Sequence, residues 1–248
     1  KPTLVAGVPP DIFSTDGQLW GNPIYNWDYL EKTDFKWWKQ RIIHNLKLYD
    51  VLRIDHFRAF ADYYSIPADA QNAKSGYWKK GIGNKFWESL KKDIGEVPII
   101  AEDLGGEDSP LVIELLNQTG FPNMKVLQFA FNKDLSNTFL PENFDRPCVC
   151  YTGTHDNDTT LGWYEHLSEK EKALFFKTVP QKQTSPVLNL ISFAIDSKAE
   201  TVIIPLQDYM QLNSSARINT PGVPKGNWVW RFRKKDITNR LKDLIKKI

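Results

Sequence analysis

The alternation of apolar runs with amphipathic segments along this sequence predicts an α/β protein with a parallel sheet. Five short apolar runs have the length and the Val, Ile and aromatic content of buried strands. Helical periodicity fills most of the intervals between them, which indicates βαβ units. About five such units are visible in 248 residues, whereas a closed (β/α)8 barrel needs eight. We therefore expect part of a TIM barrel, and no linker divides residues 1–248 into separate domains.

The predicted strands are residues 51–55, 97–102, 124–131, 148–154 and 201–206. The predicted helices are residues 34–49, 84–94, 110–119, 169–178, 186–197 and 236–248. The first helix is predicted by Phe35, Trp38 and Ile42, which recur at helical spacing. Gly95 and Gly120 follow apolar helical stripes and are expected to end their helices.

Helix starts are marked by capping residues and proline. Ser109-Pro110 and Ser185-Pro186 each place a cap before a proline at the first helical position. Ser168 and Glu171 have the spacing of a capping box. Residues 11–27, 57–83 and 207–230 are rich in Gly, Pro, Asn and aromatic residues, so we expect long irregular loops there. Such loops usually carry function.

The amino-acid composition gives no support for a highly charged binding partner. The net charge of +2 gives no reason to expect nucleic acid or an anionic membrane as partner. The sequence has no apolar run of membrane-spanning length and no signal-peptide pattern at its start. It opens on Lys1 rather than Met, so we expect a fragment or a processed chain.

Cys148 and Cys150 are the only cysteines, and they share one face of a predicted strand. A metal pair is one interpretation, but no second ligand pair follows, so two buried thiols are the better one. We expect neither a metal nor a cofactor. The low cysteine content favours a reducing compartment, namely the cytoplasm or, in a plant or alga, the plastid.

Acidic residues follow three of the predicted strands: Asp55, Glu102 and Asp156. The carboxyl ends of parallel barrel strands meet at one rim, and two facing carboxylates serve retaining glycosidic chemistry. Each acid alone also has a structural interpretation. Asp55 could form a simple ion pair, Glu102 could end its strand, and Asp156 could cap a helix in an Asx turn.

The neighbours of the first two acids suggest different roles. Arg53 shares a strand face with Asp55, and a guanidinium beside a carboxylate keeps it ionised, which suits a nucleophile. Glu102 ends a wholly apolar run, and burial together with a nearby carboxylate should raise its pKa, which suits a general acid. The adjacent Asp103 should point to the opposite face.

Several sequence blocks resemble one family. The blocks are Arg53–Arg58, Ala101–Gly105 and Thr152–Thr159, with Gly7–Asp11, Gly17–Pro23, Met124–Phe131, Ile204–Asp208, Ala216–Gly222 and Gly226–Trp228 in the same order. The first three are similar to the catalytic blocks of the 4-α-glucanotransferases, also called amylomaltases or disproportionating enzymes, of the α-amylase clan. The resemblance covers the C-terminal half of that family's chain. It implies that the five strands are the fourth to eighth of a (β/α)8 barrel, and that residues 1–30 form a substrate and lid region before them.

The resemblance also implies roles for site residues. Asp55 would attack the anomeric carbon of an α-1,4-glucan, and Glu102 would act first as acid and then as base. Asp156 would bind ring hydroxyls of the distorted sugar. Arg53 would keep Asp55 charged, and His155 would bind sugar hydroxyls.

The lid resemblance adds four candidates for contact with the glucan. Asp11 and Trp20 lie in the block similar to the family's lid, and Gln18 and Asn219 are further candidates for hydrogen bonds. Trp20 is the tryptophan most suited to stack on a sugar, because Trp38 and Trp87 lie on helix stripes and are expected in the core.

The expected reaction is transfer of glucan segments from maltooligosaccharides or starch to the 4-OH of glucose or a glucan. A hydrolase of the same clan is an alternative, as is an inactive fragment that at most binds glucan. The loops around Trp20 and Asn219 favour transfer. Half a barrel exposes an open sheet edge, so we expect either the missing N-terminal half or a second copy as partner, or poor activity.

Overall fold

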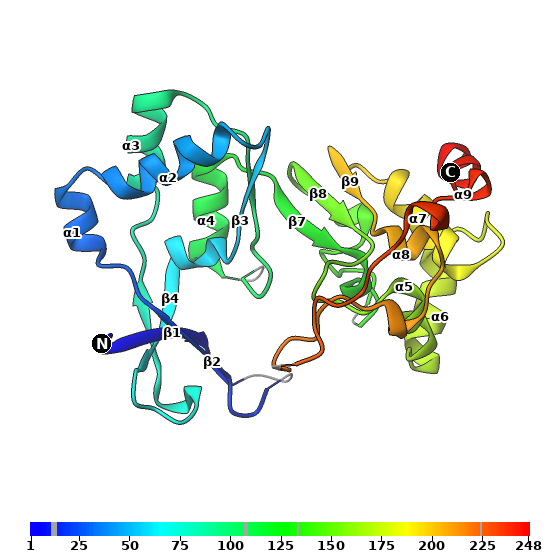
Figure 1. Ribbon diagram of the computed structural model, residues 1–248, viewed down its shortest axis with the longest axis horizontal. Helices are drawn as coiled ribbons and strands as arrows, with labels where there is room; N and C mark the ends of the chain where they lie inside the picture. Colours follow the sequence, from blue (N-terminus) through cyan, green and yellow to red (C-terminus); the bar gives the residue numbers. More distant parts are fainter. Residues whose placement is uncertain (11–13, 107–108, 133, 224) are drawn as a thin grey trace. The chain divides into compact units, whose positions relative to one another are not determined.

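The computed structural model describes residues 1–10, 14–106, 109–132, 134–223 and 225–248 (Figure 1). Two compact units are present, Lys1–Asn123 and Met124–Ile248. All five predicted strands are found in part, and so are all six predicted helices.

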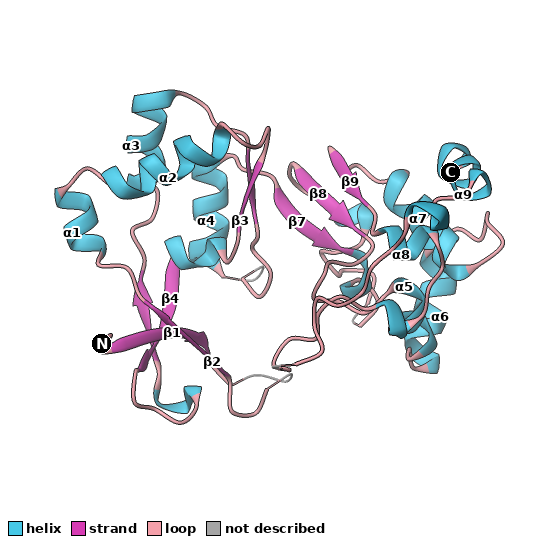
Figure 2. Ribbon diagram, in the orientation of Figure 1, coloured by secondary structure: helices cyan, strands magenta, loops and turns pink. Residues whose placement is uncertain are grey.

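The first unit contains an antiparallel sheet that the sequence did not predict. Strands β1 (Leu4–Val8), β2 (Gln18–Pro23), β4 (Asp62–Pro67) and β5 (Tyr77–Lys80) pair in the order β2-β1-β4-β5 (Figure 2). The expectation of irregular loops over residues 11–27 and 57–83 was therefore wrong where these strands lie. Strand β2 itself contains Gly21, Asn22 and Pro23, residues that had suggested a loop. Val5, Tyr64 and Ile66 form a small apolar core in this part of the unit.

Gly7 allows two of these strands to approach closely. A β-carbon at Gly7 would collide with the backbone carbonyl of Gln18 on β2 and with the side chain of Ile66 on β4. Glycine has no β-carbon, so the backbone of β2 can lie against β1 at this point. The glycine thereby helps to place Gln18 and Trp20.

The first unit also contains one parallel pair, β3 (Leu52–Ile54) with β6 (Ile99–Ala101), in which Leu52 faces Ile99. Four helices accompany it: α1 (Trp27–Lys32), α2 (Lys36–Leu46), α3 (Lys85–Ile94) and α4 (Pro110–Thr119). Strands and helices share one apolar core that contains Trp38 and Trp87, as predicted. Parallel strands buried in this way are typical of an α/β fold.

The second unit has a sheet of strands β7 (Asn123–Val126), β8 (Cys148–Tyr151) and β9 (Thr201–Ile203), in that order, with β8 and β9 parallel. Its helices are α5 (Thr160–Glu165), α6 (Glu169–Thr178), α7 (Pro186–Ile195), α8 (Leu206–Tyr209) and α9 (Asn239–Lys247). Apolar side chains of α7 pack with residues of α5, α8 and α9. Helices α1, α5 and α8 were not predicted, because each is too short to show a helical period.

The strands end earlier than predicted. Strand β7 gives way after Val126 to a 3-10 turn at Leu127–Phe129, and β9 stops before Pro205, which precedes α8. The polar residues that follow each strand therefore lie in turns. This frees their side chains from the alternation that a strand imposes.

The helix ends mostly follow the prediction. Gly95 and Gly120 take left-handed φ values of +77° and +68°, and the Ser168–Glu171 capping box is formed. Ser185 accepts the backbone N–H of Leu188, as expected of a cap. Ser109 was expected to do the same, but within the described residues its side chain makes no capping hydrogen bond.

Three further findings concern thiols, metals and membranes. Cys148 and Cys150 are both buried, as predicted. Among the described residues, no three His, Cys, Asp or Glu side chains gather in a way that could hold a metal ion. No helix in the described ranges has the length and apolar character needed to cross a membrane.

Candidate active site

Glu102 and Asp55 are brought together by the parallel pairing of β3 and β6. Each follows the end of its strand, and the backbone N–H of Glu102 donates to the carbonyl of Ile54 at 3.0 Å. The backbone N–H of Phe57 donates in turn to the carbonyl of Glu102 at 2.8 Å. The ladder thus continues past both strand ends and fixes the two turns side by side.

The Glu102 carboxylate is held by two backbone N–H groups. His56 donates to Oε2 at 2.6 Å, and Leu104 donates to Oε1 at 3.0 Å. His56 has a left-handed φ of +49°. A non-glycine residue in this region carries a strain of about 1 kcal/mol, which is tolerated where the surrounding structure requires it. Here the left-handed turn accompanies the hydrogen bond from His56 to the carboxylate.

The pKa of Glu102 is raised from 4.5 to about 7, chiefly by burial and also by the negative charge of Asp55. The two backbone hydrogen bonds and the Arg53 charge act in the opposite direction but are weaker together. The predicted effect of the apolar run is thus confirmed. A carboxyl with this pKa is partly protonated near neutral pH, so it can donate a proton and later accept one.

Asp55 has the opposite environment. Its side chain is 80% exposed, and its Oδ1 lies 2.9 Å from Nη2 of Arg53. The predicted pairing of these two residues is therefore confirmed. The Arg53 guanidinium thus places a positive charge beside an exposed carboxylate. Glu102 and Asp55 are thus neighbouring carboxyls with different surroundings, one partly buried and one exposed.

Asp103 does not share this site. It is 1% exposed and accepts a hydrogen bond from Nδ2 of Asn123 at 2.9 Å. This agrees with the expectation that Asp103 points away from Glu102.

Trp20 and Gln18, two of the candidates from the lid block, lie near the turn that carries Asp55 and His56. Trp20 on β2 is 42% exposed, and the centre of its ring is 4.9 Å from that of His56, edge to face. Nε1 of Trp20 donates to Oε1 of Gln18 at 3.1 Å. A cavity of about 580 Å³ is lined by residues that include Trp20, Arg53, Asp55 and His56. Asp11 lies outside the described residues.

The second unit holds the third acid in a polar cluster of its own. Oδ1 of Asp156 accepts a hydrogen bond from Nδ2 of Asn219 at 2.5 Å, and Oδ2 lies 3.3 Å from Nε2 of His155. The backbone N–H of Asn219 also donates to the carbonyl of His155 at 3.1 Å. The structure therefore joins His155, Asp156 and Asn219, which the sequence suggested as separate candidates.

Arg217 completes this cluster from the segment that carries Asn219. Its Nη2 donates to the carbonyl of Asp156 at 2.7 Å, and its Nε donates to the carbonyl of Asn219 at 2.8 Å. The guanidinium thus ties the Asp156 loop to the Asn219 segment. Trp228 lies next to the cluster, with its ring centre 5.3 Å from that of His155.

Sequence reasoning did not select His56, Arg217 or Trp228 as site residues. All three belong to blocks that resemble the family, which was the available signal. The contacts that distinguish them, with Glu102, Asp156 and His155 respectively, depend on the fold.

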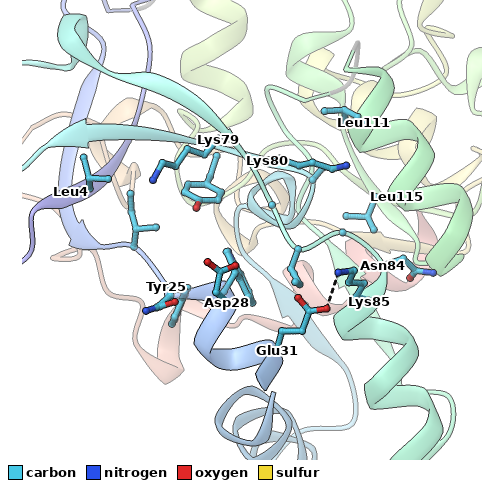
Figure 3. Close-up of a pocket in the computed structure, with 18 of the residues that line it drawn as sticks. Leu4, Tyr25, Asp28, Glu31, Lys79, Lys80, Asn84, Lys85, Leu111 and Leu115 are labelled. Carbon is cyan, nitrogen blue, oxygen red and sulfur yellow. Dashed lines mark hydrogen bonds and ion pairs between the residues drawn. The ribbon is translucent and has the colours of Figure 1, made fainter. Parts of the chain in front are cut away.

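Another cavity of about 1040 Å³ in the first unit adjoins the first cavity and shares Tyr25, Trp27 and Tyr63 with it (Figure 3). Its lining includes Asp28, Lys79 and Lys80, and an ion pair of 2.7 Å joins Lys85 to Glu31 on its wall. None of the predicted site residues that the structure describes lines it. Acidic and basic side chains both line this cavity.

Comparison with known proteins identifies the family. A family model described as 4-alpha-glucanotransferase matches residues 2–238. The 4-alpha-glucanotransferase of Clostridium butyricum is 47% identical over 99% of this chain and 50% of its own length. That of Thermus thermophilus is 46% identical over 94% of this chain and 48% of its own length.

A solved structure of amylomaltase from Streptococcus agalactiae, in complex with acarbose, matches with a TM-score of 0.95 and 40% identity. The match covers 99% of this chain and 50% of that one. The chain thus spans about half the length of these relatives. A match of this extent and identity leads to one conclusion: the chain belongs to the 4-alpha-glucanotransferase family.

Proposed function

We propose that this chain carries the residues for retaining transfer of α-1,4-glucan segments from a maltooligosaccharide or starch donor to the 4-OH of a glucose or glucan acceptor. The observation that carries the proposal is the unequal pair of neighbouring carboxyls. Glu102 is partly buried with a pKa of about 7, and Asp55 is exposed and paired with Arg53. Family membership supports the same chemistry.

In the first step the Asp55 carboxylate attacks the anomeric carbon and forms an ester bond to the sugar. The glycosidic C–O bond breaks, and Glu102 gives its proton to the leaving oxygen. Arg53 keeps Asp55 ionised before the attack. Two carboxyl groups roughly 5–5.5 Å apart suit this geometry.

In the second step Glu102, now a carboxylate, takes the proton of the acceptor hydroxyl. The acceptor oxygen attacks the anomeric carbon, and the ester bond to Asp55 breaks. Two inversions retain the configuration. Both enzyme carboxyls return to their starting protonation states, so the cycle is balanced.

The cluster around Asp156 is proposed to bind the reacting sugar in the same reaction. Its carboxylate is half exposed, and Asn219 and His155 hold its two oxygens. A carboxylate fixed in this way can accept hydrogen bonds from sugar hydroxyls without first losing rotational freedom. His155 and Asn219 offer further polar atoms, and Trp228 offers a ring face for stacking.

Transfer rather than hydrolysis requires that an acceptor sugar compete with water. We propose that Trp20 and Gln18, beside His56, contact the acceptor and exclude water, together with Asp11. The alternative is an α-1,4-glucan hydrolase of the same clan. Incubation with maltotriose distinguishes the two: longer maltooligosaccharides indicate transfer, and shorter products alone indicate hydrolysis.

We further propose that the five parallel strands belong to one incomplete (β/α)8 barrel that a partner completes. Leu48, Tyr49 and Val51, just before β3, are large apolar side chains exposed to solvent. Apolar side chains grouped in this way are typical of an interface. The missing half of the relatives' length is the proposed partner, and a second copy of this chain is the alternative.

This partner proposal is tested by adding the upstream half as a separate chain and measuring transfer and mass in solution. We expect a one-to-one complex with higher activity than this chain alone. Full activity of the isolated monomer would contradict it.

The proposed compartment is the cytoplasm or a plastid, since relatives include bacterial proteins and a rice protein described as chloroplastic/amyloplastic.

A further inference from the structure

Asp208 is a buried carboxylate to which the proposed reaction gives no part. It lies on α8, is 1% exposed, and accepts three hydrogen bonds. The Thr152 hydroxyl donates to Oδ2 at 2.6 Å, and the Thr160 hydroxyl donates to the same oxygen at 2.7 Å. The backbone N–H of Thr160 donates to Oδ1 at 2.8 Å.

The two threonines mark the two ends of the loop that carries His155 and Asp156. Thr152 directly follows β8, and Thr160 is the first residue of α5. Both are almost completely buried, at 0% and 1% exposure. One carboxylate therefore joins the start and the end of the loop, and it comes from a third segment of the chain.

Two other hydrogen bonds hold the loop between β8 and α5 at Asp158. Nε2 of Gln128 donates to the carbonyl of Asp158 at 2.9 Å, and the Ser214 hydroxyl donates to the Asp158 carboxylate at 2.6 Å. Gln128 also reaches the start of the loop, because its backbone N–H donates to the carbonyl of Thr152 at 3.3 Å. Asp208 differs from Gln128 in that one of its carboxylate oxygens accepts the side-chain hydroxyls of both end residues, Thr152 and Thr160.

Burying a carboxylate is unfavourable unless donors replace its hydration. Burial raises the pKa of Asp208, while the donors Thr152 and Thr160 lower it. An apolar residue of similar size could fill this space without that cost, so the carboxylate does more than fill the core. A fully bonded buried polar group selects one arrangement of the groups around it.

We propose that Asp208 is a positioning residue that fixes the Asp156 loop for glucan binding. This inference rests on the proposed function of Asp156. With the ends of the loop joined, Asp156 stays in reach of Asn219 and Arg217, and its carboxylate keeps one direction. Without Asp208 the loop samples other arrangements, and the affinity for the sugar falls.

The test compares Asp208→Asn, Thr152→Val and Thr152→Ser with the unchanged chain. Asp208→Asn keeps nearly the same shape but removes the charge, and Thr152→Val removes one hydroxyl at constant volume. Thr152→Ser keeps that hydroxyl and should behave like the unchanged chain. Asp196→Asn is the matched control, because Asp196 is an exposed aspartate of the same unit, paired with Lys182 at 3.5 Å.

Two readouts are measured: amide hydrogen exchange of residues 153–160 by mass spectrometry, and KM against kcat for transfer from maltotriose. We expect exchange in the loop to become at least about tenfold faster in Asp208→Asn, with exchange elsewhere unchanged. We expect KM to rise about fivefold or more. Thr152→Val should change exchange and KM in the same direction. The double variant Asp208→Asn/Thr152→Val should show little further change beyond Asp208→Asn.

Three results would overturn the proposal: unchanged exchange in the loop, equally faster exchange throughout the second unit, or an unchanged KM. If Asp208→Asn does not fold, Thr152→Val tests the same contact. If the unchanged protein makes no transfer products even with the upstream half added as a separate chain, the proposed function fails. The exchange measurement then still decides whether Asp208 fixes the loop.

Discussion

The backbone N–H of His56 donates to Oε2 of Glu102 at 2.6 Å, which links the turn after β3 to the acid after β6. Because His56 directly follows Asp55, this bond places the proposed acid and the proposed nucleophile in neighbouring turns. The same contact opposes the rise in the pKa of Glu102 that burial produces. It therefore bears on both the position and the proton affinity of the acid.

Glu102→Gln should lower transfer from maltotriose by about 10²- to 10⁴-fold, because the amide cannot protonate the leaving oxygen. A glycosyl fluoride donor needs no such proton, so formation of the glycosyl-enzyme from the fluoride should be far less affected. The initial burst of fluoride release and the initial rate of transfer from maltotriose test this. Glu96→Gln is the matched control, since Glu96 is exposed and remote from Asp55. Equal losses with both donors would contradict the acid role.

The raised pKa of Glu102 also predicts a pH dependence of stability. Between pH 4.5 and about 7, folded Glu102 keeps its proton, whereas the unfolded chain has lost it. The free energy of unfolding should therefore fall as pH rises across this window, by about 3 kcal/mol in total from this group. Urea unfolding of the unchanged chain and of Glu102→Gln at several pH values measures the difference. Parallel curves for the two proteins would contradict the raised pKa.

Asp55→Asn should abolish transfer, with a loss on the order of 10⁴-fold or more, because the amide is not a nucleophile. The side chain is 80% exposed and loses only a surface ion pair with Arg53, so the free energy of unfolding should change by less than about 1 kcal/mol. Asp50→Asn, an exposed aspartate five residues earlier, is the control and should keep full activity. Substantial activity of Asp55→Asn would remove the proposed nucleophile.

Trp20→Ala should lower the ratio of transfer to hydrolysis several-fold, because the half-exposed ring would no longer exclude water beside His56. The ratio is measured from the longer maltooligosaccharides and the free reducing ends formed from maltotriose. Tyr29→Ala removes an exposed aromatic ring on α1 and serves as control. An unchanged ratio in Trp20→Ala would rule out the proposed contact with the acceptor.

Local spacing was enough to predict part of the site. Arg53 and Asp55 stand two apart in the sequence at the end of β3, close enough for their side chains to pair. The partial burial of Glu102 was expected from the apolar run before it. Both predictions depend only on residues that are neighbours along the chain, so they could be made from the sequence.

The contacts that depend on distant segments could not be predicted in this way. Asn219 and Arg217 reach Asp156 across 63 and 61 residues. The antiparallel sheet needs β1 to pair with β4, far along the chain, and the glycines and prolines between them suggested loops instead. The left-handed turn at His56 has no local signal, since histidine does not require it.

The most direct test is to identify the residue that becomes glycosylated. Glu102→Gln lacks the base for the second step, so after incubation with a glycosyl fluoride the covalent intermediate should accumulate. Mass spectrometry of the digested protein should then find the sugar on the peptide that contains Asp55, and specifically on its carboxylate. Sugar attached to another residue, or equal labelling when Asp55 is also replaced by Asn, would contradict the proposed mechanism.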